Sequence, residues 1–263
     1  MLTVGSLCTG IGGIDLGLER AGMTVKWQAD NDHFARRVLW KNWRSTPNLG
    51  DIKKVRWETV EPVDVITAGY PCQPFSIAGQ RKGQDDDRHL WPYLLQPICV
   101  LRPRWLLLEN VPGHLSLGFG QVLGDLAEIG YDTEWDCLPA AAFGAPHLRD
   151  RLFVVAHTDR EGLTWSRHVF PVGNNGSEGD MADADKLGGG TGSEEIGTWL
   201  RWGKPANSGG SDGGNWAVEP GMGRVAYGIP DRMDRVRVLG NSVVPQIAEH
   251  IGNMIMEAER GSK

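Results

Sequence analysis

Up to residue 156 the chain alternates between short apolar runs and stretches in which apolar residues recur every three or four positions. The first pattern favours strands, and the second favours helices that bury one side. The run 105–108 is apolar throughout, as expected for a strand of a parallel sheet covered on both faces. We therefore predict strands over 2–7, 25–29, 63–68, 104–108, 131–138 and 152–156, and helices over 14–22, 33–40, 89–101, 117–129 and 246–259.

The pattern changes at residue 157, after which Leu, Ile and Val become rare. Gly, Asn, Ser, Asp and Trp dominate up to about residue 223. Such a composition cannot bury a large core, so we predict a small irregular region with loops. Regular patterning returns at Arg224. We therefore divide the chain into three parts, which are residues 1–156, 157–223 and 224–263.

Composition and charge narrow the class of protein. The 263 residues suit one large domain with a small addition. The four cysteines form no CxxC pair, and no histidine stands at metal-ligand spacing, so neither a metal site nor a disulfide framework is expected. No apolar run could span a membrane and no signal peptide is visible, which favours a cytoplasmic protein. The net charge of −6 gives no sign of nucleic acid, so DNA binding would have to rest on local basic clusters.

One cysteine stands in an unusual setting, in the segment Gly69-Tyr70-Pro71-Cys72-Gln73-Pro74-Phe75-Ser76, where a predicted strand gives way to a loop. A cysteine that only packs in a core needs no prolines around it. A reactive thiol needs a rigid backbone and surroundings that lower its pKa. Cys72 is therefore a candidate nucleophile, although an isolated cysteine is more often a buried core residue.

Polar residues follow the first predicted strands. The glycine-rich turn Thr9-Gly10-Ile11-Gly12-Gly13 precedes a helix and allows a ligand to approach its N–H groups, but a purely structural turn is about as plausible. Asp30 ends the second strand, where a carboxylate can accept hydrogen bonds from ribose hydroxyls. We interpret Asp32 first as a helix N-cap. Asp51 and Ile52 are candidates for a third contact with the same ligand.

Further polar groups recur later in the chain. A basic segment between Gly79 and Gly83 suggests a mobile loop that closes over a substrate, or else a solvated charge run. Glu109 follows the apolar strand 104–108, where open α/β sheets bind ligands. Arg149 and Arg151 are spaced to lie on one side of a strand-like segment and suit an anion or a base edge, or else surface ion pairs.

In this order, these motifs resemble those of the C5-cytosine DNA methyltransferases of bacterial and phage restriction–modification systems. The resemblance covers residues 5–156 and about 216–258, and the combination of Pro71-Cys72-Gln73-Pro74-Phe75-Ser76 with Glu109-Asn110-Val111 is specific. It implies an α/β fold of the S-adenosylmethionine-dependent methyltransferase (Rossmann-like) type. Its mixed, mostly parallel sheet is flanked by helices, and the last helix returns to the first part of the chain. Residues 157–223 take the place of the target-recognition region.

The resemblance also implies S-adenosyl-L-methionine as cofactor. The glycine-rich turn holds the methionine moiety, Asp30 the ribose and the Asp51-Ile52 tip the adenine. Cys8 departs from the family, which often has Phe there, so an aromatic contact to the cofactor is in doubt. The implied cofactor residues are Thr9, Gly10, Ile11, Gly12, Gly13, Asp30, Asn31, Asp51, Ile52, Pro71, Asn241 and Ser242.

The implied reaction is methylation at C5 of a cytosine flipped out of duplex DNA. Cys72 adds to C6, and Glu109 holds N3, for which burial should raise its pKa. Arg149 and Arg151 hold O2 and a nearby phosphate. The loop that closes over the base includes Gln73, Ser76, Gln80, Arg81 and Lys82. A monomer is expected, with any cognate restriction endonuclease acting separately.

Three other classes stay open on the sequence. A C5-cytosine RNA methyltransferase of the tRNA type would share the fold and differ in the recognition region. A non-catalytic DNA-binding relative would not need Cys72, Glu109 and Arg149 together. A dinucleotide-dependent oxidoreductase would need a hydride-transfer site, for which no motif is visible.

Overall fold

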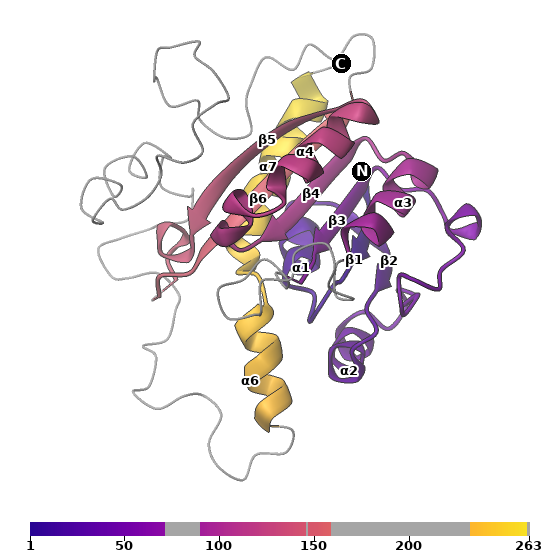
Figure 1. Ribbon diagram of the computed structural model, residues 1–263. Helices are drawn as coiled ribbons and strands as arrows, with labels where there is room; N and C mark the ends of the chain where they lie inside the picture. The colour runs from indigo at the N-terminus through magenta and orange to yellow at the C-terminus, as the bar shows by residue number, and fades with distance from the viewer. Residues whose placement is uncertain (72–89, 146, 159–231, 262–263) are drawn as a thin grey trace.

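The computed structural model describes residues 1–71, 90–145, 147–158 and 232–261 (Figure 1). Its centre is a six-stranded sheet in the order β2-β1-β3-β4-β6-β5. Strands β1 to β4 are parallel, and β6 pairs antiparallel with both β4 and β5. The strands are β1 (Thr3–Leu7), β2 (Thr24–Ala29), β3 (Val65–Gly69), β4 (Trp105–Asn110), β5 (Tyr131–Pro139) and β6 (Asp150–Thr158). The expectation of a mixed, mostly parallel sheet flanked by helices is confirmed.

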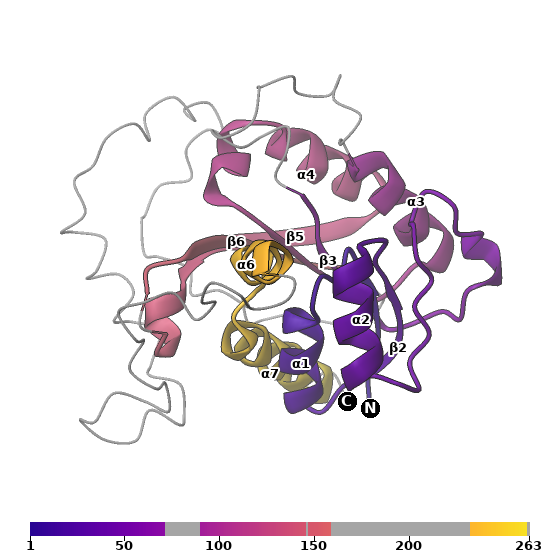
Figure 2. The same ribbon diagram turned by 90° about the horizontal axis from the view of Figure 1, so that it is seen from below.

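Helices cover both faces of the sheet (Figure 2). Helices α1 and α7 lie on one face, and α3 and α4 on the other, while α2 lies beside α1. The helices are α1 (Gly13–Arg20), α2 (His33–Asn42), α3 (Trp91–Leu101), α4 (Phe119–Glu128), α6 (Arg232–Asn241) and α7 (Pro245–Gly261). The 3-10 turns are η1 (Trp57–Thr59), η3 (Pro112–Ser116) and η4 (Ala140–Phe143). In the described part of the chain, no helix has the length and apolar character needed to cross a membrane.

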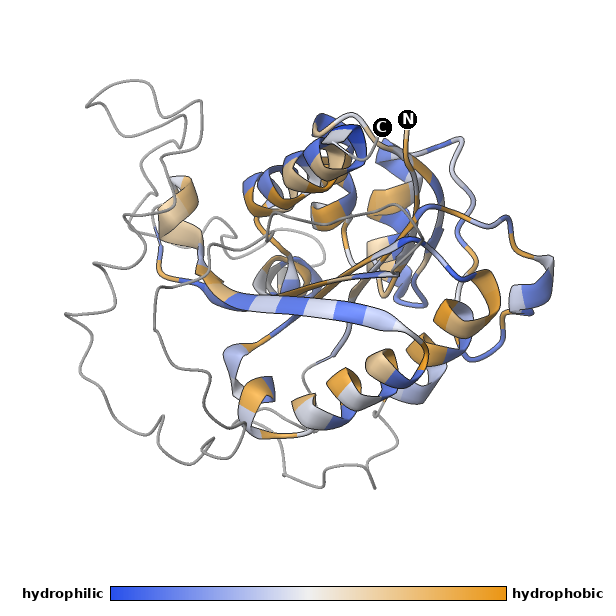
Figure 3. Ribbon diagram, turned by 90° about the horizontal axis from the view of Figure 1, so that it is seen from above, coloured by the Kyte–Doolittle hydropathy of each residue, from blue (hydrophilic) through white to orange (hydrophobic). Residues whose placement is uncertain are grey.

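Strand alternation divides the core between the two faces. On β4, Trp105 and Leu107 pack toward α1 and α7, whereas Leu106 and Leu108 pack toward α3 and α4. Figure 3 shows apolar colours on the helix sides that face the sheet. Because both faces of β4 are covered, every one of its residues is buried. Its apolar run is therefore the expected sequence of a doubly covered strand.

Helix α7 joins the C-terminal part of the chain to the first helix. Its residues Ile247, Ile251 and Ile255 share one core with Leu18 of α1. The helices approach closely at Gly17, where an added Cβ would lie 2.4 Å from the carbonyl oxygen of Pro245. The predicted return of the last helix to the first part of the chain is confirmed, and Pro245 is its first residue.

Two predicted boundaries differ in a way that matters for function. Strand β4 extends through Glu109 and Asn110, because both residues stay paired in the sheet with β6. Strand β6 runs to Thr158, two residues beyond the predicted boundary at 156. The strand order also places β2 and β3 on opposite sides of β1, and such a switch point is where open α/β sheets bind ligands. The predicted region 157–223 lies outside the described residues apart from the last two residues of β6.

Candidate cofactor and catalytic site

A pocket of about 620 Å³ lies at the carboxyl ends of the parallel strands. Its walls come from the segments that follow β1, β2 and β3, from the end of β4, and from the start of β6. The segment 237–243, at the end of α6, completes it. Predicted site residues that line it are Thr9, Gly10, Ile11, Gly13, Asp30, Asn31, Asp51, Ile52, Pro71, Glu109, Arg151, Asn241 and Ser242. The structure thus brings most of the predicted site together.

The glycine-rich turn forms one wall because its backbone adopts conformations that favour glycine. Gly10 and Gly12 have φ values of 58° and 83°, and Gly12 caps α1. The space around a Cβ at Gly10 is open, whereas one at Gly13 would lie 2.5 Å from the carbonyl oxygen of Val243. Gly10 therefore leaves room at the pocket, and Gly13 allows the C-terminal segment to approach.

Asp30 fixes the acidic tip of β2 to this turn. Its Oδ2 accepts a hydrogen bond from the Gly10 N–H at 2.7 Å, and its Oδ1 accepts one from the Asp32 N–H at 2.8 Å. Burial raises the pKa of Asp30, and these two donors oppose the rise. Asp32 accepts from the Ala35 N–H at 2.8 Å, which confirms it as the N-cap of α2. Asp30 thus joins the tip of β2 to the glycine-rich turn, while Asp32 begins a helix.

Glu109 is the buried acid of the site. Only 7% of the residue is exposed, and its Oε1 lies 3.0 Å from Nε of Arg151. Burial raises the pKa of Glu109 to about 7, although Arg151 and Arg149 both act to lower it. The expected upward shift is confirmed, and its cause is desolvation. A carboxyl group with this pKa holds or releases a proton near neutral pH.

The two arginines have different partners. Arg151 pairs with Glu109, whereas Nη2 of Arg149 donates to the carbonyl oxygens of Gly240 at 2.6 Å and Ser242 at 2.8 Å. Nε of Arg149 is buried and has no hydrogen-bond partner among the described residues. Desolvation lowers the pKa of Arg149. Arg149, which directly precedes β6, therefore holds the start of that strand to the end of α6 and to the segment that follows it.

A polar cluster behind Glu109 was not predicted. The Tyr70 hydroxyl lies 2.8 Å from Nε2 of His114, and Nδ1 of His114 lies 2.9 Å from the Leu117 carbonyl oxygen. Since only Nδ1–H can donate to that carbonyl, we assign Nε2 as the acceptor of the Tyr70 O–H. Burial raises the pKa of Tyr70, so it stays a phenol. No local sequence pattern connects residues 70 and 114, although Tyr70 does adjoin Pro71.

Several predicted residues cannot be placed. Cys72, Gln73, Ser76, Gln80, Arg81 and Lys82 lie outside the described residues, and Pro71 is the last position before that gap. Gly12 and Arg149 are described, but neither is among the residues that line the pocket. Within the described ranges, no group of three or more His, Cys, Asp or Glu side chains is arranged to hold a metal ion.

The described lining fits S-adenosylmethionine. The Asp30 carboxylate suits vicinal ribose hydroxyls, and Asp51 adds negative charge that suits a cationic sulfonium. Gly10 gives access to backbone N–H groups for an amino-acid carboxylate. Cys8 lines the pocket where the family often has Phe, and burial together with Asp30 and Asp51 raises the pKa of its thiol to about 12. It therefore offers a neutral surface in place of an aromatic ring.

Comparison with known proteins gives consistent matches. A model of the family described as C-5 cytosine-specific DNA methylase matches residues 2–186. The chain is 40% identical over 164 residues to the type II methyltransferase M.NaeI of Lentzea aerocolonigenes, covering 59% of this chain and 40% of that protein. It is 35% identical over 158 residues to M.NgoBI of Neisseria gonorrhoeae, covering 58% and 50%. The chain thus spans half or less of the length of these two relatives.

Solved structures show the same fold. A putative DNA modification methyltransferase encoded within an E. coli prophage superposes with a TM-score of 0.51 at 28% identity, covering 60% of this chain and 47% of that one. The Dnmt2 methyltransferase of S. pombe superposes with a TM-score of 0.53 at 24% identity, covering 62% and 52%. The second likeness concerns the fold alone.

Proposed function

The chain belongs to the family of C-5 cytosine-specific DNA methylases, and from that premise we propose that it methylates C5 of a flipped-out cytosine in duplex DNA. The single observation that carries this proposal is Glu109, a buried carboxyl group in the pocket whose pKa is raised to about 7. Pro71, the residue that precedes Cys72 in the sequence, lines the same pocket as this acid.

The first step activates a carbon that is a weak nucleophile. The Cys72 thiolate attacks C6 of cytosine and forms an S–C6 bond, while the electron pair of the C5–C6 double bond moves toward N3. A protonated Glu109 holds N3 and relieves the charge that develops there. Its raised pKa supports this role, since an ordinary carboxyl would be ionised at neutral pH. Cytosine C6 is inaccessible in a duplex, so the base must first leave the stack at a cost of about a few kcal/mol.

S-adenosylmethionine supplies the electrophilic methyl group that C5 then takes. The glycine-rich turn, Asp30, the Asp51-Ile52 tip and the Asn241-Ser242 segment would hold it. Loss of the C5 proton, for which we propose water as the base, restores the double bond and expels the Cys72 thiolate.

The arginines have complementary parts in this proposal. Arg151 orients Glu109 through the 3.0 Å contact and offers positive charge to O2 or a nearby phosphate. Arg149 offers its buried Nε, which has no partner within the described residues. Removing the positive charge of either should weaken the hold on the base more than the hold on the cofactor.

We extend the proposal to the setting of the reaction. Duplex DNA is the substrate, residues 157–223 read a short site, and the protein acts as a cytoplasmic monomer. A cognate restriction endonuclease would act as a separate protein. These statements rest on the family and on the length of the region 157–223. The relatives share only part of their length with this chain.

The test is incubation with methyl-labelled S-adenosylmethionine and either duplex DNA or tRNA. We expect label in DNA alone, with 5-methylcytosine at one short sequence on sequencing. Cys72→Ser should abolish transfer while cofactor binding persists, because a hydroxyl is far less nucleophilic than a thiolate. Label in tRNA alone would favour the RNA methyltransferase, and full activity of Cys72→Ser would overturn the mechanism.

A further inference from the structure

Helix α6 crosses the outer side of the cofactor pocket with little apolar support. Arg237, Val238 and Asn241 line the pocket. Among the α6 side chains that the structure describes, Val238 alone is buried, while Met233 and Leu239 are 73% and 50% exposed. The described side chains of α6 therefore give the helix little packing against the rest of the protein. Polar contacts contribute to its position.

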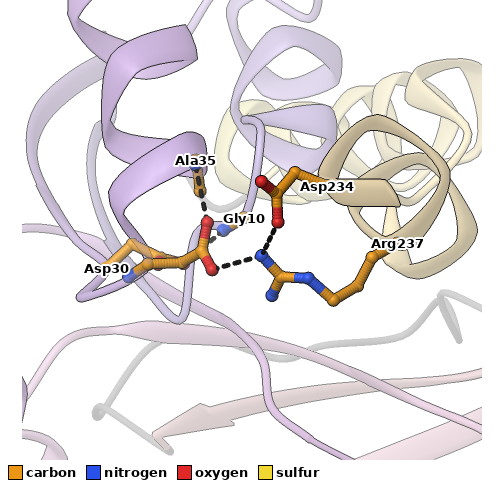
Figure 4. Close-up of polar contacts among 6 residues, drawn as sticks. Gly10, Asp30, Ala35, Asp234 and Arg237 are labelled. Carbon is orange, nitrogen blue, oxygen red and sulfur yellow. Dashed lines mark hydrogen bonds and ion pairs between the residues drawn. The ribbon is translucent and has the colours of Figure 1, made fainter. Parts of the chain in front are cut away.

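One of these contacts reaches the loop that carries the acidic tip (Figure 4). Nη2 of Arg237 lies 2.6 Å from Oδ2 of Asp32 and 3.2 Å from Oδ1 of Asp234. Asp234 is three residues earlier on the same helix, so it orients the guanidinium toward Asp32. The pair with Asp32 joins two segments 205 residues apart in the sequence.

Asp32 is itself fixed to the pocket. It caps α2, and its N–H donates to Asp30, which in turn accepts from Gly10. Arg237 is therefore linked by consecutive hydrogen bonds to Asp30, which we propose as the ribose acceptor, and to the glycine-rich turn. Movement of α6 away from the pocket requires rupture of the Arg237–Asp32 pair.

We propose that the Arg237–Asp32 ion pair is a latch that holds α6 over the cofactor pocket and slows the release of S-adenosylmethionine. Arg237 is thus a positioning residue, acting through α6. The inference rests on the proposed function, because it takes the same cofactor as the occupant. The exposed fractions of the two side chains are 50% and 27%, so water and salt weaken the pair and the latch is a modest one.

The latch is tested by the rate at which the full chain releases tritiated S-adenosylmethionine after a chase with unlabelled cofactor. At low salt, Arg237→Gln and Asp32→Asn should each release it about two- to fivefold faster. Asn keeps an N-cap acceptor for α2, so Asp32→Asn removes the charge and leaves the helix start intact. The double variant should match the single ones, because each breaks the same contact.

Two further measurements separate a latch from a general loss of structure. Added salt should speed release from the native protein and leave the variants nearly unchanged, since it screens the pair. The KM for the cofactor should rise without a proportional fall in kcat. Arg20→Gln is the matched control, because Arg20 pairs with Glu249 between α1 and α7, and neither residue lines the pocket.

Each outcome decides between the proposals. Native release rates in both variants, additive effects in the double variant, or an equal effect of Arg20→Gln would overturn the latch alone. A native protein that fails to bind S-adenosylmethionine would overturn the proposed function and the latch together.

Discussion

At the scale of single residues, the fold removes the carboxyl groups of Glu109 and Asp15 from water. Glu109 faces the pocket, and Asp15 lies completely buried beneath the glycine-rich turn, where its Oδ2 accepts from Nε2 of Gln28 at 2.6 Å. Desolvation is the largest cause of the raised pKa of both groups. Glu109 lines the pocket and Asp15 does not, so we expect Asp15 to affect the stability of the fold rather than the reaction.

Replacing Glu109 by Gln should separate catalysis from binding. The amide keeps the shape but cannot share a proton with N3, so turnover should fall about 100-fold or more. Affinity for duplex DNA should change little, because phosphate contacts dominate it. Single-turnover methylation and DNA titration measure the two quantities, with the exposed Glu128→Gln as control. Comparable losses of both would contradict the N3 role.

Asp15→Asn should change how stability depends on pH. Burial raises the pKa of Asp15 to about 6, so the folded state holds a proton that the unfolded chain releases above about pH 4. The contribution of protonated Asp15 to the free energy of unfolding is therefore fully present below pH 4, and it is lost as the pH rises through 6. The variant should gain up to about 3 kcal/mol relative to the native protein between pH 4 and 7.5.

Urea unfolding across that range measures this gain. Asp132→Asn, at an exposed position of β5, controls for the loss of one negative charge. A difference between the native protein and Asp15→Asn that stays constant with pH would show that Asp15 is ionised in the folded protein.

At the scale of elements, the contact between α1 and α7 depends on missing side chains. An added Cβ at Gly17 would lie 2.4 Å from the Pro245 carbonyl oxygen and 2.6 Å from Cβ of Ala248. Glycine in a helix normally costs stability, so its presence in α1 is explained by the approach of α7. The glycine thus sets the distance between the first and last helices.

Gly17→Ala should destabilise the protein although alanine is the better helix former. Forcing the helices apart should cost about 1–3 kcal/mol, against a propensity gain of about 1 kcal/mol. Gly124→Ala in α4 is the matched control, because no atom lies within 4 Å of a Cβ there and stability should rise. Urea midpoints compare the two, and a stabilised Gly17→Ala would show that α7 can shift at little cost.

The positions of helices and strands were largely predictable from the sequence. The contacts between distant segments were not. The buried run of β4, the N-cap at Asp32 and the amphipathic face of α7 all leave local patterns, and the structure contains all three. The end of β4 was placed too early, because a polar residue at a strand end looks like a loop unless its pairing with β6 is known. The Tyr70–His114 and Arg237–Asp32 contacts join distant segments and leave no periodic signal.

At the scale of the whole molecule, the C-terminal helix is part of the core. Ile247, Ile251 and Ile255 are each at most 1% exposed and share a cluster with Val4 of β1 and Val155 of β6. Strand β1 and helix α7 must therefore come together before this face of the sheet is covered. Folding of the cofactor-binding half and of the C-terminal segment should be one cooperative event.

Hydrogen exchange tests that cooperativity. The central amides of α7 should exchange as slowly as those of β1 and β4, because all open only on global unfolding. Ile251→Ala should cost about 2–5 kcal/mol and lower protection in α1 and α7 alike. Faster exchange of α7 alone would show that it opens as a separate unit.

The antiparallel direction of β6 has a consequence for how this sequence can evolve. The strand starts where the parallel strands end, so Arg151 meets Glu109 while Phe153 and Val155 enter the core. Insertion or deletion of one codon after Arg151 would turn either Arg151 away from Glu109 or Phe153 and Val155 to the face on which Leu152, Val154 and Ala156 now pack. A change in the length of β6 would therefore disturb the Arg151–Glu109 ion pair or the packing of both cores, and we expect its length to be strictly kept.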